Sequence, residues 1–153
     1  MTYQMLRPVE FLLVEDNPGD IRLTRESLAE SKIYNHLSVV NDDGVEALSF
    51  LRREGQYENA LRPDVILLDL NLPKMSGHEV LAQIKQDPAL LDIPVVVLTA
   101  SSSEEDIAKS YNKHANCFIT KPLDYDQFIR VVRSINDFLL SIVKLPQEKP
   151  RVA

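Results

Sequence analysis

Three acidic residues have the types and positions to do chemistry. Glu15 and Asp16 are adjacent and follow the apolar run from Phe11 to Val14, and Asp69 ends a second apolar run, "DVILLD". Two carboxylates about 4 Å apart repel each other by about 4 kcal/mol at an effective dielectric constant of about 20. A hard divalent cation such as Mg²⁺ prefers oxygen ligands and would offset that repulsion. These acids therefore predict a metal site.

A hydroxyl and an ammonium group complete the set of candidate residues. Thr99 ends the run "IPVVVLT", and Lys121 follows the run "CFIT". Carboxylates can attack phosphorus and form covalent aspartyl phosphates. The cation and Lys121 would neutralise charge on the transferring phosphoryl group, and Thr99 could donate a hydrogen bond to one of its oxygens. The residues thus favour phosphoryl transfer to Asp69.

Each residue taken alone has an ordinary structural explanation. An acid at a strand end, such as Asp69, can be a helix cap or a solvated loop residue, and Glu15 and Asp16 could simply cap the first helix. Thr99 could be a turn residue, and Lys121, which precedes a proline, could be a surface charge. The site is favoured because four successive strand ends each carry a suitable group.

Short apolar runs are the elements that would position these residues. They are rich in Val, Ile and Leu and mostly lack alternation with polar residues, which is typical of parallel strands buried on both faces. The expected strands are residues 11–14, 37–40, 64–69, 93–99 and 117–120.

Stretches with helical spacing separate these runs. The first helix should begin after Asn17, which would cap it. Further helices should begin near residues 44, 77, 101 and 124. This βα repeat predicts a doubly wound α/β domain with right-handed crossovers. Ligands in such domains bind beyond the carboxyl ends of the strands, where the acids, the hydroxyl and the lysine would meet.

Composition narrows the classes of function. The chain has 153 residues, of which 44% are apolar and 26% charged, and fits one globular domain with a sizeable core. Its net charge of −6 argues against a nucleic-acid partner. The single cysteine, Cys117, excludes an internal disulfide, and the three histidines lack zinc-type spacing. No apolar run has the length of a membrane span or a signal peptide, so we expect a cytoplasmic protein without a membrane partner.

Four motifs resemble the receiver domain of two-component response regulators. They are "LLVEDN", "ILLDLNLPKMSG", "VVVLTAS" and "FITKPL", and the resemblance extends over residues 9–145. It implies an α/β, flavodoxin-like, doubly wound sheet of five parallel strands in the order 2-1-3-4-5, with helices on both faces. It also implies a signalling protein rather than an enzyme, although such a protein could catalyse its own phosphotransfer and dephosphorylation.

The resemblance assigns a role to each candidate residue. It implies that Asp69 accepts a phosphoryl group from a phosphohistidine of a sensor histidine kinase. It implies a Mg²⁺ ion, which Mn²⁺ or Ca²⁺ could replace in a crystal. The implied metal ligands are Glu15, Asp16, Asp69 and the backbone carbonyl of Asn71. The implied switch residues are Thr99 and Phe118, and Lys121 would contact the phosphoryl group.

Three positions depart from the usual pattern of these receiver domains. The acidic pair is Glu15 and Asp16 rather than two aspartates, a change that such families tolerate. Ser76 stands where an aspartate often precedes the glycine. Phe118 lacks the hydroxyl of the tyrosine that some members have, so a switch there would rest on packing.

Longer stretches resemble single-domain regulators that partner cyanobacterial phytochrome-type histidine kinases. These stretches are "EDNPGDIRLTRE", "RREGQYENALRPD", "KSYNKHANCFITKPLD" and "FLLSIVKLP". They imply a light-sensing kinase as phosphodonor. We expect residues 1–145 to form the receiver domain with an extended C-terminal helix, and residues 146–153 to form a flexible tail. The output would then be a contact with a downstream protein, or onward transfer to a phosphotransfer protein.

The C-terminal helix has an apolar face that continues further than a monomer needs. Its apolar residues include Phe138, Leu139, Ile142 and Val143. They could fold back on the protein's own surface or form a partner surface, since large exposed apolar patches usually mark interfaces. We expect a homodimer through this face.

Other functions on a similar fold fit less well. A phosphatase of the haloacid dehalogenase type would need an acid two residues after Asp69, where Asn71 stands. A flavin binder would need a phosphate cradle where "EDNPGD" would repel phosphate, and the P-loop pattern of nucleotide hydrolases is missing. An adaptor that works without phosphorylation would be favoured if Asp69, Thr99 or Lys121 were missing, and all three are present.

Overall fold

A parallel sheet forms the centre of the molecule. The structure is a computed structural model, and it describes residues 7–31, 33–41, 43–99, 117–120, 126–127, 129–131 and 134. The strands are β1 (Val9–Val14), β2 (Asn35–Val40), β3 (Val65–Asp69), β4 (Val95–Thr99) and β5 (Cys117–Thr120). They pair in the order β2-β1-β3-β4-β5, and every pair is parallel.

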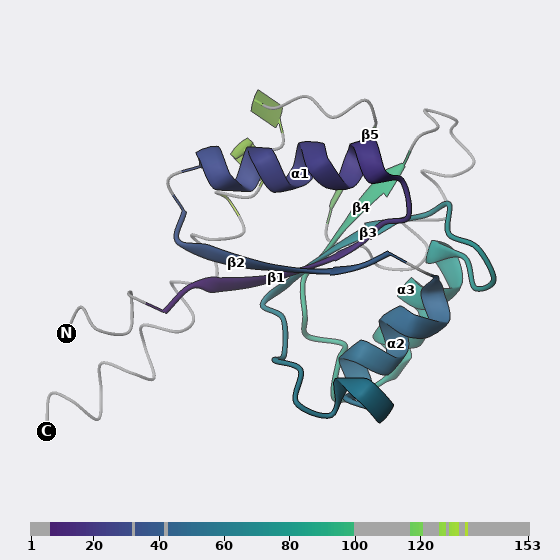
Figure 1. The fold of residues 1–153 in the computed structure, drawn as a ribbon. Coiled ribbons are helices and arrows are strands. Elements are labelled where there is room, and N and C mark those ends of the chain that lie inside the picture. The colour runs from purple at the N-terminus through teal and green to yellow at the C-terminus, as the bar shows by residue number, and fades with distance from the viewer. Residues whose placement is uncertain are drawn as a thin grey trace, which may run out of the picture.

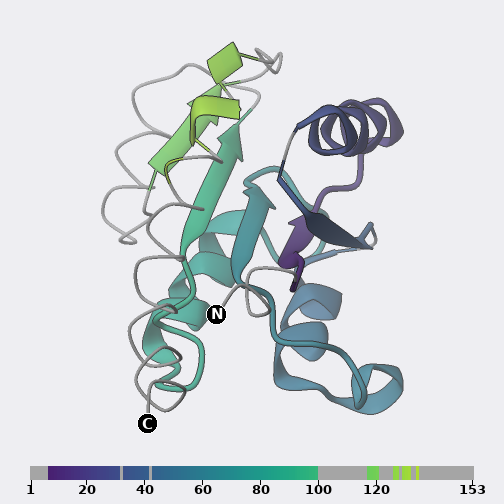
Figure 2. The same cartoon turned by 90° about the vertical axis from the view of Figure 1, so that its left-hand side faces the viewer.

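Helices flank the sheet on both sides. The helices with defined bounds are α1 (Pro18–Glu30), α2 (Gly44–Arg52) and α3 (Gly77–Gln86), with a short 3₁₀ helix, η2, at Gly55–Tyr57. The described residues 126–127, 129–131 and 134 are also helical. Figures 1 and 2 show α1 on one face and α2 and α3 on the other. The predicted α/β class and parallel sheet are therefore confirmed.

The start of α1 follows the sequence prediction in detail. Asn17 is the N-cap, and its Oδ1 accepts a hydrogen bond of 3.0 Å from the backbone N–H of Asp20. Pro18 takes the first helical position, where its missing N–H costs nothing and its fixed φ suits the helix. The helix therefore begins three residues after β1 ends.

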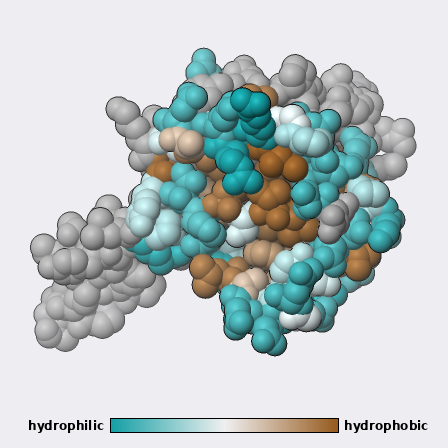
Figure 3. All heavy atoms as spheres, in the orientation of Figure 1, coloured by the Kyte–Doolittle hydropathy of each residue, from teal (hydrophilic) through white to brown (hydrophobic). Residues whose placement is uncertain are grey.

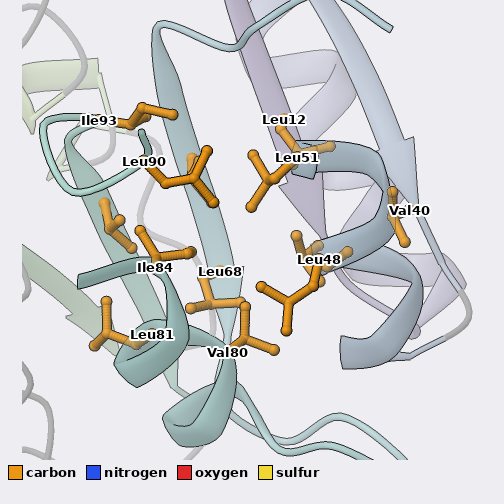
Figure 4. Close-up of a cluster of buried hydrophobic side chains, with 14 of the residues drawn as sticks. Leu12, Val40, Leu48, Leu51, Leu68, Val80, Leu81, Ile84, Leu90 and Ile93 are labelled. Atoms are coloured by element: carbon orange, nitrogen blue, oxygen red, sulfur yellow. The ribbon is translucent and has the colours of Figure 1, made fainter. Parts of the chain in front are cut away.

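Two hydrophobic clusters hold the layers together, one on each face of the sheet. Along β1, Leu12 and Val14 belong to the cluster beneath α2 and α3, whereas Phe11 and Leu13 belong to the cluster beneath α1. Figure 4 shows side chains of the first cluster pointing toward one another from the sheet, from both helices and from the loop after α3. Because both faces are covered, the strands are apolar throughout.

The amino-terminal edge of the sheet is tied by polar contacts. The Asp64 carboxylate, just before β3, accepts hydrogen bonds from Arg7 at 3.0 and 3.2 Å and from the backbone N–H of Glu10 at 2.8 Å. The Glu10 side chain in turn lies 2.8 Å from Nδ1 of His36 on β2. These contacts join the beginnings of β1, β2 and β3.

The outer strand β2 is only half covered. Its residues before Val40 are intermediate or exposed, and Figure 3 shows apolar side chains gathered on this face, where β2 runs between α1 and α2 in Figure 1. Among the helices that the structure describes, none is long and apolar enough to cross a membrane.

Candidate functional site

Strand register brings Glu15 and Asp69 to the same level of the carboxyl edge. Val14 is paired with Leu68, so the next residue on each strand, Glu15 and Asp69, lies one step further along in the same direction. The ladder continues at this level, because the backbone N–H of Glu15 donates to the carbonyl of Val40 at 3.2 Å. The position of both acids is thus fixed by backbone pairing.

Three carboxylates meet at this edge. One oxygen each from Glu15, Asp16 and Asp69 lie within 4.8 Å of one another. Glu15 is 0% exposed and Asp69 is 3% exposed, whereas Asp16 faces solvent. Burying carboxylates side by side is costly unless a positive charge compensates them. Three carboxylate oxygens, one of them open to water, form a donor set that suits a hard divalent cation such as Mg²⁺.

Backbone N–H groups orient the two buried carboxylates. The N–H of Asn17 donates to Oε2 of Glu15 at 3.3 Å, and the N–H of Asn71 donates to Oδ1 of Asp69 at 3.2 Å. In both cases the donor lies two residues after the acid, where the chain leaves its strand. The turn that ends each strand therefore also fixes the acid's side chain.

The β3–α3 loop, residues 70–76, closes tightly after Asp69. The backbone N–H of Gly77 donates to the carbonyl of Leu70 at 3.0 Å, which brings the two ends of the loop together. Lys74 within it has φ of 61°, in the left-handed region that side chains disfavour. The backbone of the loop that follows Asp69 in the chain is therefore conformationally constrained.

Ser76, which departs from the usual receiver pattern, caps α3. The Ser76 Oγ accepts from the backbone N–H of Glu79 at 3.3 Å, and the Glu79 carboxylate accepts from the backbone N–H of Ser76 at 3.4 Å. This reciprocal pair is a capping box. The spacing S-x-x-E in the sequence is the signal that could have identified it.

Asp43 is a buried acid that lies beside the site. The sequence pattern predicted only that a helix begins near this residue. Its Oδ1 accepts from the backbone N–H of Glu46 at 3.0 Å, and its Oδ2 lies 3.4 Å from Nζ of Lys74. The hydrogen bond from Glu46 lowers the pKa of Asp43 below its ordinary value, and Lys74 lowers that pKa further against the opposing effect of burial. No local pattern predicts the pair with Lys74, because 31 positions separate the two residues.

A cleft of about 820 Å³ adjoins the acidic cluster. Its lining residues are Asp16, Asn41, Asp43, Val45, Glu46, Pro73 and Lys74. Asp16 thus faces both the cluster and this cleft, which leaves the exposed side of the site open to an incoming group.

Comparison with known proteins identifies the family. The model of the response regulator receiver domain matches residues 11–133. The chain belongs to the response regulator receiver family. That match covers most of β1, all of β2 to β5 and all three acids of the cluster, so the cluster lies inside the receiver domain.

Relatives of this receiver domain include regulators of phytochrome signalling. It is 49% identical to the response regulator Rcp1 of Synechocystis sp. over 139 residues, which are 91% of this chain and 94% of that protein. The crystal structure of the phosphorylated cyanobacterial phytochrome response regulator RcpA is 52% identical, with a TM-score of 0.76 over 89% of this chain and 96% of that one. The crystal structure of Mn²⁺-bound Rcp1 is 49% identical, with a TM-score of 0.75 over 87% of this chain and 95% of that one.

Several predicted site residues of the receiver domain are described only in part or not at all. Thr99 ends β4 in register with Thr120, and Phe118 lies in β5, but their side chains lie outside the described part of the structure. Asn71 is exposed and follows Asp69 by two positions. The residues that lie outside the described ranges altogether are Lys121, Phe138, Leu139, Ile142 and Val143.

Proposed function

We propose that this receiver domain accepts a phosphoryl group on Asp69 from a phosphohistidine of a sensor histidine kinase. The observation that carries this proposal is the cluster of Glu15, Asp16 and Asp69, whose oxygens lie within 4.8 Å of one another at the carboxyl edge of the sheet. Membership of the receiver family, in which phosphoryl acceptance is the standard role, supports it.

Asp69 would act as the nucleophile through one carboxylate oxygen. Its Oδ1 accepts a hydrogen bond from the backbone N–H of Asn71, which orients the carboxylate for attack on phosphorus. The new O–P bond forms as the P–N bond to the donor imidazole breaks, and the imidazole nitrogen keeps that electron pair. The product is a mixed anhydride of the aspartate, a known type of covalent intermediate.

Glu15 and Asp16, together with Asp69 and the backbone carbonyl of Asn71, would hold Mg²⁺. The bound ion would stabilise negative charge on the phosphoryl oxygens. The burial of Glu15 and Asp69 supports this assignment, because two buried carboxylates require a compensating charge. The similar Rcp1 is a protein whose structure is known in a Mn²⁺-bound form.

Thr99, Phe118 and Lys121 would convert phosphorylation into a change of surface. A phosphoryl group adds a charge of about −1.5 to −2 at Asp69. We infer that Thr99 and Lys121 move toward this charge and that Phe118 packs into the space that Thr99 leaves, which biases a two-state face. The position of Thr99 and Phe118 on adjacent strands, β4 and β5, supports this role.

The donor would be a phytochrome-type histidine kinase. The support is the similarity to RcpA, which is described as a cyanobacterial phytochrome response regulator. The phosphorylated protein would then signal through a downstream protein contact or pass its phosphoryl group to a phosphotransfer protein. Asn71 disfavours the alternative of a phosphatase with an aspartate nucleophile, because an amide cannot serve as its acid and base.

We also propose the arrangement of the rest of the domain. Residues 1–145 would form the complete doubly wound receiver domain with an extended C-terminal helix, and residues 146–153 would form a flexible tail. That helix would make a homodimer through Phe138, Leu139, Ile142 and Val143. The apolar spacing of these residues is the support for the dimer.

Phosphorylation by a small donor tests the proposed function. We expect acetyl phosphate with Mg²⁺ to add one phosphoryl mass to the intact protein, and Asp69→Asn or EDTA to prevent this addition. Asp87→Asn, which changes a partly buried acid just after α3, is the matched control and should be phosphorylated like the wild type. An adduct that survives Asp69→Asn, or that forms equally well without divalent metal, would contradict the proposal.

A further inference from the structure

Lys74 has a backbone conformation that its side chain disfavours. Its φ is 61°, and among the described residues only Arg53, with φ of 56°, shares this feature outside glycine. A Cβ atom in the left-handed region crowds the neighbouring carbonyl, so glycine or asparagine usually takes such positions. An interaction elsewhere must therefore hold Lys74 in this shape.

The Lys74 side chain forms an ion pair with Asp43. Nζ of Lys74 lies 3.4 Å from Oδ2 of Asp43, whose residue is only 6% exposed. The other oxygen of Asp43 accepts a hydrogen bond from the backbone N–H of Glu46 in the first turn of α2, so the orientation of the carboxylate is fixed. The Lys74 side chain is 76% exposed and reaches from the β3–α3 loop to this fixed anchor.

Two glycines allow the β3–α3 loop to pack closely against α2 and β3. A Cβ on Gly44 would collide with the backbone carbonyl of Met75 and lie 2.7 Å from Cγ2 of Val80. A Cβ on Gly77 would collide with the backbone carbonyl of Asp69 and lie 2.5 Å from Cα of Leu70. The loop therefore touches the start of α2 on one side and the end of β3 on the other.

We propose that Lys74 is a positioning residue for the metal site. Its ion pair with Asp43 fixes the β3–α3 loop against α2, and the loop in turn fixes Asn71 beside Asp69. The N–H of Asn71 already orients the Asp69 carboxylate, and its carbonyl is the proposed fourth metal ligand. This inference rests on the proposed function, because it concerns the same Mg²⁺ site.

The charge of Lys74 alone predicts the opposite effect on Mg²⁺ affinity. The cleft that Lys74 lines also contains Asp16, Asp43 and Glu46. Removing the ammonium makes this region more negative, which by itself would strengthen the binding of a divalent cation. A positioning role requires weaker binding instead, so the direction of the change separates the two explanations.

Mg²⁺ titration by isothermal calorimetry provides the first test. We expect Lys74→Ala to weaken Mg²⁺ binding by about tenfold, as loss of an outer-shell contact does in other metal sites, and Lys74→Arg to bind within about twofold of the wild type. Lys74→Gly removes the backbone strain and the ion pair together, and we expect it to bind as weakly as Lys74→Ala. Unchanged or tighter binding in Lys74→Ala or Lys74→Gly would overturn the inference.

Arg53→Ala is the matched control. Arg53 carries the same charge and the same left-handed backbone, but it follows the other end of α2. We expect this variant to bind Mg²⁺ within about twofold of the wild type. A loss equal to that of Lys74→Ala would show that any lost positive charge or strained residue has this effect, and would overturn the inference.

Hydrogen exchange of the Gly77 amide gives a readout that needs no metal. This N–H donates to the carbonyl of Leu70 and reports whether the loop is closed. Without Mg²⁺, we expect Lys74→Ala and Lys74→Gly to exchange about tenfold faster than the wild type, and Lys74→Arg and Arg53→Ala to match it. Equal rates in Lys74→Ala and the wild type would overturn the inference. If wild-type protein bound no Mg²⁺, the proposed function would fail, whereas this exchange rate would still show whether Lys74 fixes the β3–α3 loop.

Discussion

At the scale of residues, the chemistry depends on where acids stand relative to strand ends. The acids of the cluster could be selected from the sequence because Glu15 and Asp16 follow one apolar run in succession and Asp69 ends another, and parallel strands end at one edge. The pair of Asp43 and Lys74 could not be selected in this way. It depends on the path of two loops that are distant in the sequence, and no periodic pattern records that path.

Asp16 should be needed for metal binding but not for folding. It is exposed, and one of its carboxylate oxygens lies within 4.8 Å of those of Glu15 and Asp69. We expect Asp16→Ala to lower Mg²⁺ affinity by at least about tenfold, measured by calorimetry, with an unchanged circular dichroism spectrum. Asp20→Ala, a change of the same charge in the first turn of α1, should keep its affinity. Equal affinities for Asp16→Ala and the wild type would contradict the ligand assignment.

At the scale of elements, α1, α2 and α3 begin just beyond the edge of the sheet where the acids lie. Side chains of Asn17, Asp43 and Ser76 cap α1, α2 and α3, and each accepts a hydrogen bond from a backbone N–H three residues later. The strands were predictable from their apolar Val, Ile and Leu runs, although β1 and β2 begin two residues before the predicted starts, at Val9 and Asn35, and β3 and β4 begin later, at Val65 and Val95. The helix η2 was not predictable, because its three residues are too few for a periodic pattern.

The Asp43 cap should contribute stability that depends on pH. Because the pKa of Asp43 is lower in the folded protein than its ordinary value, the unfolded chain binds more protons, and stability rises with pH. The contribution is complete above the ordinary pKa of about 3.9 and is lost as pH falls through the lowered value. We expect Asp43→Ala to lower the free energy of unfolding by about 1–2 kcal/mol at pH 7, measured in urea.

The pH dependence of this difference is the check on its cause. The gap between Asp43→Ala and the wild type should narrow steadily once the pH is below about 4. Asp20→Ala, which removes a first-turn acid but leaves the N-cap residue in place, is the comparison variant for these measurements. A gap that stays constant down to low pH would mean that the Asp43 charge contributes nothing.

Gly77 should be essential for the shape of the β3–α3 loop. A Cβ there would collide with the backbone of Asp69 and Leu70, which cannot move without disturbing β3. We expect Gly77→Ala to lower the free energy of unfolding by about 3 kcal/mol. In Gly19→Ala, the new Cβ meets only the Asn17 side chain, at 3.3 Å. The free energy of unfolding, measured by thermal denaturation, should therefore change by less than about 1 kcal/mol. Similar stability of the two variants would refute this explanation of Gly77.

At the scale of the whole molecule, the two edges of the sheet have different tasks. The amino-terminal edge is tied by Asp64, which joins Arg7 to the start of β3, while the carboxyl edge gathers the acidic cluster. Hydrophobic clusters on both faces hold the strands in register between these edges. The sheet therefore positions the acidic cluster, and the loops at the carboxyl edge are the segments that can change conformation when the cluster binds a ligand.

The proposed homodimer also belongs to this scale. We expect sedimentation equilibrium at tens of micromolar to give a dimer, because an apolar helix face favours self-association. Leu139→Glu places a charge on the proposed face and should give a monomer that still binds Mg²⁺. Leu23→Glu, at an exposed apolar position on α1, is the control and should remain dimeric. A wild-type monomer, with and without a phosphoryl analogue, would rule the dimer out.

Chemical mapping of the phosphoryl group tests most directly whether Asp69 is the acceptor. Borohydride reduces an aspartyl phosphate to homoserine, so the modified residue is marked permanently and can be located by peptide mass spectrometry. After incubation with acetyl phosphate and Mg²⁺, we expect homoserine at position 69 and unmodified aspartate at positions 16 and 43. Homoserine at another position, or an unreduced Asp69 in protein that carries a phosphoryl group, would contradict the central claim.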